Sequence, residues 1–399
     1  MTTKSMIPAL AVTAALVGAT AGAAGATAAT STTDPMRDAA RHVLAAGAPG
    51  YMARIDTGRR VTVTAAGVAD RATGRTLNGR EQFEIGSNTK TFMAALTLQL
   101  VDQRKVDLDA SVERYLPGVV PNGRAITVRM LLNHTSGLFN YTSDPDFFTD
   151  MEKDPQRVLT SKELLEVAFR NDPTFAPGAG WSYSNTNYIL TGMILEKLTR
   201  TSLPDLVQQR IARPLGLTKT YFADPRATST GRGYAHGYAV RFAGGEPEYT
   251  DTSSWPIGGW GGAAGAIIST QEDLATFFAA LMRGELFSQR QLAQMKTTVE
   301  IPESFGMPGG YGLGLFRKDT ACGTVWGHGG DTMGHHSLGV VTADGSRTAV
   351  GDVTAEPADT GENPGVNRYY RVVMAADEVA VCRMLGKPVP AEVLAALHS

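Results

Sequence analysis

The sequence is poor in cysteine, in net charge and in long apolar runs, and each shortage excludes a class of protein. Its 399 residues include only 2 cysteines, too few for a disulfide-dense scaffold or a four-cysteine zinc site. Lys and Arg number 37 against 39 Asp and Glu, so a formal net charge of −2 gives no field to attract nucleic acid. Hydrophobic residues make up 43% of the chain, which excludes global disorder.

The N-terminal segment predicts export. Lys4 precedes an apolar run from Met6 to Val17, and an Ala- and Gly-rich tail follows with a cleavage-like triplet at residues 26–28. The run is shorter than the roughly 20 residues that a transmembrane helix needs, and no later stretch is long enough. We therefore expect residues 1–29 to be a signal peptide and the mature protein to be secreted, without a stable membrane span.

The two cysteines, Cys322 and Cys382, lie 60 positions apart. They form either one disulfide or two free buried thiols, and the compartment decides between these alternatives. Export favours the disulfide, because structural disulfides persist in oxidising environments. Closing a loop of this length would stabilise the fold by roughly 4 kcal/mol in the chain-entropy model.

Hydrophobic periodicity predicts strands at both ends of the chain and helices in the middle. Apolar and polar residues alternate over residues 50–68, which predicts a β-hairpin, and strand patterns return after Gly309. Residues 104–225 read as helical segments broken by Pro and Gly, and residues 367–384 as a terminal helix. The pattern predicts an α/β (α+β) fold, with an antiparallel sheet flanked by helices and a large, mostly helical insertion.

The same pattern divides the chain. We expect residues 37–86 and 226–399 to form the α/β sheet domain and residues 87–225 the mostly helical domain. The active site is expected between the two.

Ser87 and Lys90 form an S-x-x-K motif at a predicted helix start, after a predicted strand. On a helix, a step of three residues places two side chains on one face, about 5–6 Å apart. A lysine there can take the serine proton if its amine is neutral, and backbone N–H groups at the helix start favour an oxyanion. Taken alone the motif is weak, because chance gives about one match in a chain of this length.

Two further short motifs offer proton carriers. Tyr183 and Asn185 make the only Y-x-N, and on an extended chain their side chains would point the same way. The alternative is a buried tyrosine with a nearby turn asparagine. His328 begins the only [HK]-x-G, and Gly329 and Gly330 would let a substrate approach the backbone closely.

A metal centre is the competing interpretation of the histidine-rich stretch. His328, Asp331, His335 and His336 crowd within nine positions. However, the adjacent histidines would point to opposite faces of a strand, and no H-E-x-x-H motif occurs. We therefore predict no metal and no cofactor.

Together the three motifs resemble those of the penicillin-recognising serine hydrolases: class C β-lactamases, DD-peptidases and related esterases. They occur in the same order, separated by 96 and 145 positions. The strings LLNHTSGL (Leu131 to Leu138), Pro177 to Lys197 and YGLGL (Tyr311 to Leu315) agree as well. The resemblance is strongest to secreted actinomycete-type D-alanyl-D-alanine carboxypeptidases, which also carry cysteines at the positions of Cys322 and Cys382.

The resemblance implies a role for each motif residue. Ser87 would be the nucleophile that becomes acylated, with Lys90 and Tyr183 sharing the general base and acid work in an order left open. Asn185 would hold the acyl-side amide, and His328 would assist proton transfer to the leaving group.

Other positions carry over as an oxyanion hole and as substrate contacts. The backbone N–H groups of Ser87 and Asp331 would form the oxyanion hole. The remaining substrate-contacting positions implied are Trp260, Phe147 or Phe148, Phe316, Gly329 and Gly330. The expected partners are a peptide or ester substrate and acylating β-lactams, and the expected state is a monomer.

The sequence departs from that carboxypeptidase branch where the substrate's C-terminal carboxylate would bind. An arginine and two threonines are replaced by Phe316, Gly329 and Asp331, and strand alternation turns Arg317 to the other face. Losing a bidentate arginine removes a strong contact, and the carboxylate of Asp331 would repel that of the substrate. We expect an acyl-enzyme hydrolase resembling a D-alanyl-D-alanine carboxypeptidase, with reduced strict carboxypeptidase activity. The alternatives are an esterase, an amidase or a D-aminopeptidase, or an inactive penicillin-binding sensor.

Overall fold

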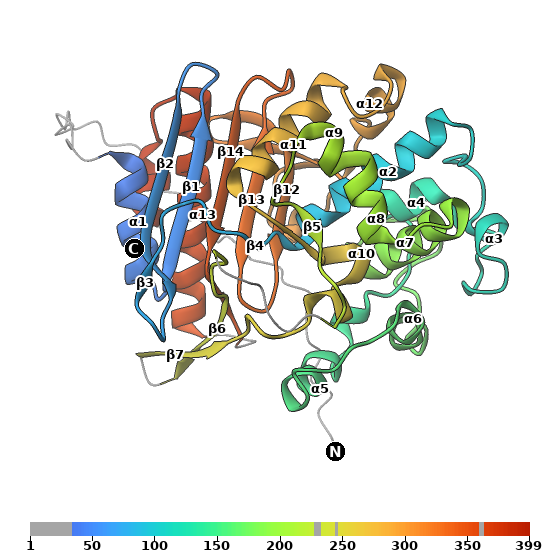
Figure 1. Ribbon diagram of the computed structural model, residues 1–399, viewed down its shortest axis with the longest axis horizontal. Coiled ribbons are helices and arrows are strands. Elements are labelled where there is room, and N and C mark those ends of the chain that lie inside the picture. Colours follow the sequence, from blue (N-terminus) through green and yellow to red (C-terminus); the bar gives the residue numbers. More distant parts are fainter. Residues whose placement is uncertain (1–33, 227–232, 244–245, 359–362) are drawn as a thin grey trace.

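The computed structural model describes residues 34–226, 233–243, 246–358 and 363–399, and the predicted signal peptide lies outside them. Its centre is a nine-stranded antiparallel sheet of order β3-β2-β1-β14-β13-β12-β11-β10-β9 (Figure 1). The strands of this sheet are β1 (Gly50–Asp56), β2 (Val61–Asp70), β3 (Arg75–Thr76), β9 (Val299–Glu300), β10 (Gly309–Tyr311), β11 (Phe316–Thr320), β12 (Gly323–Asp331), β13 (His336–Val341) and β14 (Thr348–Val353). The predicted hairpin and the return of strands after Gly309 are confirmed.

Helices cover both faces of the sheet, and each face has its own core. The helices α1 (Pro35–Ala45), α13 (Pro364–Leu385) and α14 (Ala391–Leu397) pack on one face, and α11 (Gln271–Arg283) packs on the other. Side chains alternate between the cores, so Val325 of β12 joins the α13 side and Trp326 joins the opposite side. The predicted terminal helix is therefore confirmed and longer than expected, because its apolar stripe continues to both ends.

The middle of the chain is helical, as predicted. Figure 1 shows most of these helices to the right of the sheet, with α1 and α13 at the left. They are α2 (Thr89–Asp102), α3 (Val112–Tyr115), α4 (Val128–Leu132), α5 (Phe147–Lys153), α6 (Ser161–Phe169), α7 (Asn185–Thr199), α8 (Leu203–Val207), α9 (Arg213–Leu215) and, after the main insertion, α10 (Gly262–Gly265) and α12 (Gln289–Met295).

Two small sheets complete the fold. In one, β15 (Ala355–Pro357) pairs in parallel with β6 (Tyr238–Ala243), which pairs antiparallel with β7 (Glu246–Asp251). In the other, β8 (Ile267–Ser269) lies between β4 (Phe83–Glu84) and β5 (Tyr221–Phe222). This second sheet delivers the chain to Ser87, which follows β4 by three residues.

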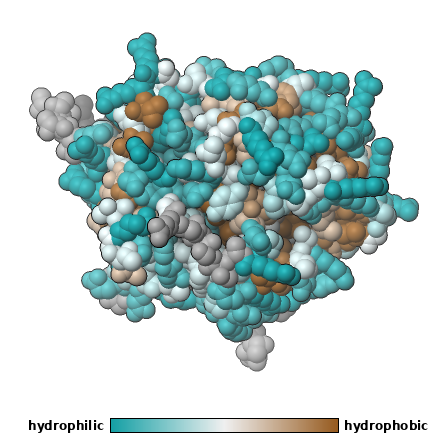
Figure 2. Space-filling model, viewed as in Figure 1, coloured by the Kyte–Doolittle hydropathy of each residue, from teal (hydrophilic) through white to brown (hydrophobic). Residues whose placement is uncertain are grey.

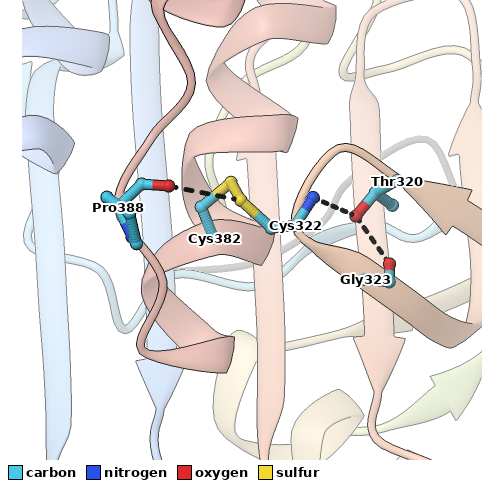
Figure 3. Close-up of a disulfide and its surroundings, with 5 residues drawn as sticks. All are labelled: Thr320, Cys322, Gly323, Cys382 and Pro388. Atoms are coloured by element: carbon cyan, nitrogen blue, oxygen red, sulfur yellow. Dashed lines mark hydrogen bonds between the residues drawn. A yellow bond between two sulfur atoms is a disulfide. The ribbon is translucent and has the colours of Figure 1, made fainter.

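The predicted disulfide between Cys322 and Cys382 is present (Figure 3). It joins the turn between β11 and β12 to α13. The turn is held by Thr320, whose hydroxyl donates to the carbonyl of Gly323 at 2.7 Å and accepts the amide of Cys322 at 3.2 Å. The carbonyl oxygen of Pro388 lies 3.6 Å from the sulfur of Cys322. The bridge therefore fastens the strand that carries His328 to the helix behind it.

Within the described residues, no helix combines the length and the apolar character needed to cross a membrane. The face of the molecule in Figure 2 is mostly hydrophilic, with hydrophobic side chains in scattered groups.

Candidate active site

Ser87 and Lys90 meet at the start of α2. Ser87 lies in a single 3₁₀ turn, η1 (Gly86–Asn88), and Lys90 lies in the first turn of α2 directly after it. Both side chains therefore lie on one face, and the Nζ of Lys90 is 2.8 Å from the Oγ of Ser87. The motif predicted this contact.

Lys90 is 0% exposed, and no carboxylate in the described part of the chain forms an ion pair with it. Its other polar contact is the carbonyl oxygen of Ala264, 2.8 Å from Nζ. Burial holds the pKa of the Lys90 amine well below its ordinary value of 10.5, although the charge of Asp331 opposes this shift. The Nζ donates to the carbonyl of Ala264, and once the amine has lost a proton it can direct its lone pair at the hydroxyl of Ser87.

Tyr183 completes a compact group with these two residues. Its ring centroid lies 4.9 Å from the Nζ of Lys90, and the side chain of Ser87 is near enough to act on the pKa of its phenol. Burial raises the pKa of the Tyr183 phenol well above 10, with the Ser87 contact opposing it. The phenol is therefore protonated at neutral pH, as a proton donor must be.

Asn185 differs from the expectation of an extended segment. Ser184 has extended backbone (φ −142°, ψ 117°), but α7 begins at Asn185. The side-chain amide of Asn185 donates to the hydroxyl of Thr142 at 3.0 Å, and its backbone N–H donates to the side chain of Asn140 at 3.0 Å. The helix start, rather than strand alternation, fixes the position of this side chain.

His134 supports Tyr183 from behind. Its ring centroid lies 4.4 Å from that of Tyr183, and its Nδ1 accepts the backbone N–H of Ser184 and the side-chain amide of Asn187, both at 3.1 Å. Because Nδ1 accepts, a neutral ring carries its proton on Nε2. Burial holds the pKa of His134 well below 6.5, so no charge forms under the phenol.

The strand β12 lies directly against η1. A Cβ at Gly330 would lie 2.0 Å from the carbonyl oxygen of Ile85 and 2.8 Å from the amide nitrogen of Ser87. A Cβ at Gly86, whose φ is +49°, would lie 2.8 Å from the amide nitrogen of Asp331. Only glycine fits at both positions, so the two backbones meet with the amide groups of Ser87 and Asp331 side by side.

Strand geometry turns the amide of Asp331 toward η1. At the hairpin end, the N–H of Thr332 donates to His335 at 2.9 Å, and Asp331 pairs with His336. Hydrogen-bonded and non-bonded pairs alternate in an antiparallel ladder, so the N–H of Asp331 points away from β13. Its paired strand on the other side, β11, begins opposite Gly327 and does not reach it. The predicted oxyanion-hole amide is therefore placed beside Ser87 and not in the ladder.

His328 lies on β12, facing the helical side. Its Nδ1 lies 2.6 Å from the carbonyl oxygen of Gly329, to which it can only donate, and its Nε2 lies 3.0 Å from the phenol of Tyr311. Burial, with Lys90 nearby, lowers the pKa of His328 to about 3. The ring is neutral at pH 7 with both nitrogens bonded, and Nε2 accepts from Tyr311. A direct proton transfer by the Nε2 of His328 therefore requires its hydrogen bond with Tyr311 to break.

Phe316 occupies the position where the carboxypeptidase resemblance calls for an arginine. Its ring is buried and lies 4.8 Å from that of His328 and 4.4 Å from that of Tyr311. Phe305 follows at 6.1 Å and packs edge-on against Trp181 at 5.0 Å. Phe316, Phe305 and Trp181 thus form one aromatic cluster. It makes the side of the site near His328 apolar.

The structure shows the partners of the two charged residues, Arg317 and Asp331, that the sequence placed near His328. Arg317 turns away from Phe316, as predicted, and its guanidinium pairs with Asp319 at 3.0 Å. The carboxylate of Asp331, expected to repel that of a substrate, has a partner, because its Oδ1 lies 2.6 Å from the Nδ1 of His336. This pair lies on the α13 face of the sheet, and His328 lies on the opposite face.

The predicted aromatic walls are placed unevenly. Trp260 is only 7% exposed, and its carbonyl accepts the phenol of Tyr141 at 2.8 Å. Phe147 is buried 5.1 Å from the ring of Tyr141, whereas Phe148 is 38% exposed. Of the two phenylalanines, Phe148 is thus the one with an accessible ring.

Several residues around the site were not singled out from the sequence. They are His134, Trp181, Ala264, Phe305 and Tyr311. His134, Trp181 and Tyr311 lie inside the strings that supported the resemblance, so those strings carried a signal. Ala264 acts through its backbone carbonyl, which no side-chain pattern reveals.

A buried lysine of lowered pKa against a serine, with a tyrosine beside both, on an antiparallel sheet flanked by helices, defines an active-site serine hydrolase of the β-lactamase and DD-peptidase fold class. The profile of the family described as Beta-lactamase matches residues 36–371. The chain belongs to this family.

Relatives of the chain carry different activities in their names. Penicillin-binding protein 4* of Bacillus subtilis is 27% identical over 71% of this chain and 63% of its own length. A D-aminopeptidase of Brucella anthropi is 30% identical over 72% of this chain and 52% of its own. The chain thus spans between about half and two thirds of the length of these relatives. A crystal structure of a D-stereospecific amidohydrolase from Streptomyces sp. matches with a TM-score of 0.76 and 36% identity, covering 89% of this chain and 99% of that one.

Proposed function

We propose that this protein is a serine amidohydrolase that forms an acyl-enzyme at Ser87 and accepts leaving groups without a carboxylate. The observation that carries the proposal is Phe316, buried against His328 and Tyr311 where a carboxypeptidase would need an arginine. The neighbouring Arg317 does not take over that place, since its guanidinium pairs with Asp319. An apolar surface disfavours an ionised leaving group, because burying an unpaired charge is costly.

In this mechanism Lys90 is the general base. The Oγ of Ser87 attacks the substrate carbonyl carbon while its proton passes to the neutral amine 2.8 Å away. The amides of Ser87 and Asp331 bind the oxyanion, a contact worth about 3–4 kcal/mol for each donor. The C–N bond then breaks as Tyr183, protonated at neutral pH, delivers its proton to the leaving amine and regains one from the ammonium of Lys90 beside it. Water hydrolyses the ester by the same steps in reverse, which frees the acid and restores Ser87.

The opposite assignment, with Tyr183 as the base, requires a phenolate. The pKa of Tyr183 is shifted upward and that of Lys90 downward, so the group that is deprotonated first is the lysine. His328 is a positioning residue in this scheme, because both of its nitrogens are bonded.

The acyl side is proposed to be a D-amino acid residue or a peptide that ends in one. This rests on the names of the relatives, a D-stereospecific amidohydrolase and a D-aminopeptidase. A D-alanyl-D-alanine carboxypeptidase is the second candidate, favoured by the resemblance of the motifs. Esters share the same acyl chemistry, and β-lactams are proposed to acylate Ser87. A sensor without turnover is disfavoured, because Ser87, Lys90 and Tyr183 are all in contact.

We further propose that the protein is secreted and monomeric. The Cys322–Cys382 disulfide supports an oxidising compartment, as does the apolar run at the N-terminus. Fractionation of a culture and size-exclusion chromatography test these two statements.

A substrate panel tests the proposed activity. The kcat/KM values for D-phenylalanine amide and L-phenylalanine amide are compared with that for a diacetyl-Lys-D-Ala-D-Ala peptide. The proposal predicts turnover of the D-amide, little of the L-amide and slow release of D-alanine. Efficient D-alanine release with an inert D-amide would establish the carboxypeptidase instead.

A further inference from the structure

Three potential metal ligands meet on the α13 side of the sheet, at the end of β12. They are Asp331 at the end of β12, His336 at the start of β13 and Glu356 in β15. One ligand atom from each lies within 4.8 Å of the others. The sequence argument against a metal considered Asp331 and His336 only with their near neighbours, and Glu356 lies too far along the chain to have been included.

His336 is oriented as a metal ligand would be. Its Nε2 lies 3.2 Å from the Oδ2 of Asp377 on α13, and its Nδ1 points at Asp331. Metal-bound histidines almost always donate their second N–H to a carboxylate or a carbonyl, which fixes the ring. Asp377 supplies that carboxylate, and Nδ1, which bonds to Asp331 at 2.6 Å, is the nitrogen that would exchange this contact for an ion shared with Asp331.

Glu356 has an unused oxygen that points to the same conclusion. Its Oε1 accepts the phenol of Tyr370 at 2.5 Å, whereas its Oε2 is buried and has no hydrogen-bond partner. A buried carboxylate oxygen without a partner is costly, and a coordinated cation removes that cost.

Carboxyl groups outnumber basic side chains around the three residues. They belong to Asp331, Glu356 and Asp377, and His336 is the one basic side chain that pairs with them among the described residues. The side chain of Asp331 is 62% exposed, which leaves an entry path from solvent, and that of His336 is 9% exposed.

We propose that Asp331, His336 and Glu356 bind a divalent cation such as Zn²⁺ or Mn²⁺, with Asp377 orienting the histidine. Two carboxylates and one imidazole suit these ions, and water fills the remaining positions. The ion is not part of the hydrolytic reaction. It holds the end of β12, and the amide of Asp331 faces Ser87 from that same residue, so bound metal stabilises the oxyanion-hole strand.

Isothermal titration of the EDTA-treated, full-length protein with ZnCl₂ or MnCl₂ at pH 7.5 tests the site. One bound ion is expected, together with a higher melting temperature. Glu356→Gln keeps the shape of the side chain, and Asp331→Asn changes a largely exposed one. Each should weaken binding by about tenfold or more, the usual effect of losing a metal-site group. Circular dichroism establishes that both variants fold.

A second cluster in the described part of the chain supplies the control. Asp38, His42 and His398 also bring three ligand atoms within 4.8 Å, but Asp38 is paired with Arg41. His398→Ala should leave the titration unchanged. The proposal is overturned if no ion binds, if Glu356→Gln and Asp331→Asn bind as the parent does, or if His398→Ala alone loses binding. Repeating the titration with Ser87→Ala separates metal binding from the proposed hydrolase activity.

Discussion

The Nζ of Lys90 lies 2.8 Å from the Oγ of Ser87, and the same Nζ lies 2.8 Å from the carbonyl oxygen of Ala264. Because burial holds the pKa of Lys90 well below 10.5, this amine is ready to accept the serine proton. The base form exists above the lowered pKa, so kcat/KM should rise with pH through it. His328, whose pKa is lowered to about 3, should contribute no limb near 6.5.

Lys90→Arg tests this assignment. Arginine stays protonated and cannot accept the serine proton, so kcat/KM should fall by about 10²–10⁴-fold, the usual contribution of a general base. Full pH profiles of the parent and of His328→Gln provide the comparison. An ascending limb near 6.5 that disappears in His328→Gln would assign the base to histidine instead.

The contact between Tyr311 and His328 predicts a split between stability and catalysis. Tyr311→Phe removes the donor to Nε2 of His328 and should cost about 1 kcal/mol of unfolding free energy. It should also lower kcat, because the imidazole is no longer fixed. Tyr115→Phe is the matched control, because this tyrosine lies away from the site. Its phenol oxygen accepts a hydrogen bond of 2.8 Å from the backbone amide of Asp107. An equal loss of kcat in both variants would mean that Tyr311 acts only through stability.

Phe316→Arg should convert the leaving-group preference. A guanidinium at this position offers a bidentate partner to a carboxylate, so the kcat/KM for release of D-alanine from the diacetyl peptide should rise by about tenfold or more. Phe316→Leu opens similar space without charge and should not raise it. Equal gains in the two variants would show that space, not charge, limits the peptide.

The disulfide should stabilise the fold without entering the chemistry. Replacing Cys322 and Cys382 by serine removes a bridge across 60 positions, which should lower the unfolding free energy by roughly 4 kcal/mol. Denaturant titration measures this, and active-site titration gives the activity per folded molecule. If the serine variant lost activity while it remained folded, the disulfide would be needed for the active site and not only for stability.

The sequence was most informative where function depends on side chains at a fixed spacing. The S-x-x-K step predicted the Ser87–Lys90 contact because helix geometry alone sets that distance. The hairpin and terminal helix followed from periodicity. Contacts made by the backbone were not accessible, such as the Ala264 carbonyl on Lys90 and the close approach of Gly330 to Ser87.

Side-chain contacts that depend on the folded chain were also hidden. The carboxylate of Asp331 could be read only as a charge near the site, because its partner His336 and the intervening sheet are properties of the folded chain. The same holds for Phe305 and Trp181, whose contact joins a 3₁₀ turn, η5 (Glu303–Phe305), to the segment before α7.

The most direct test of the central claim is acid quenching during turnover of D-phenylalanine methyl ester, followed by whole-protein mass spectrometry and peptide mapping. We predict a D-phenylalanyl adduct on the peptide that contains Ser87, absent from Ser87→Ala. An acyl-enzyme at Ser87 would be contradicted if Ser87→Ala still turned over the ester without forming an adduct. An adduct on another residue of the parent protein would contradict it as well.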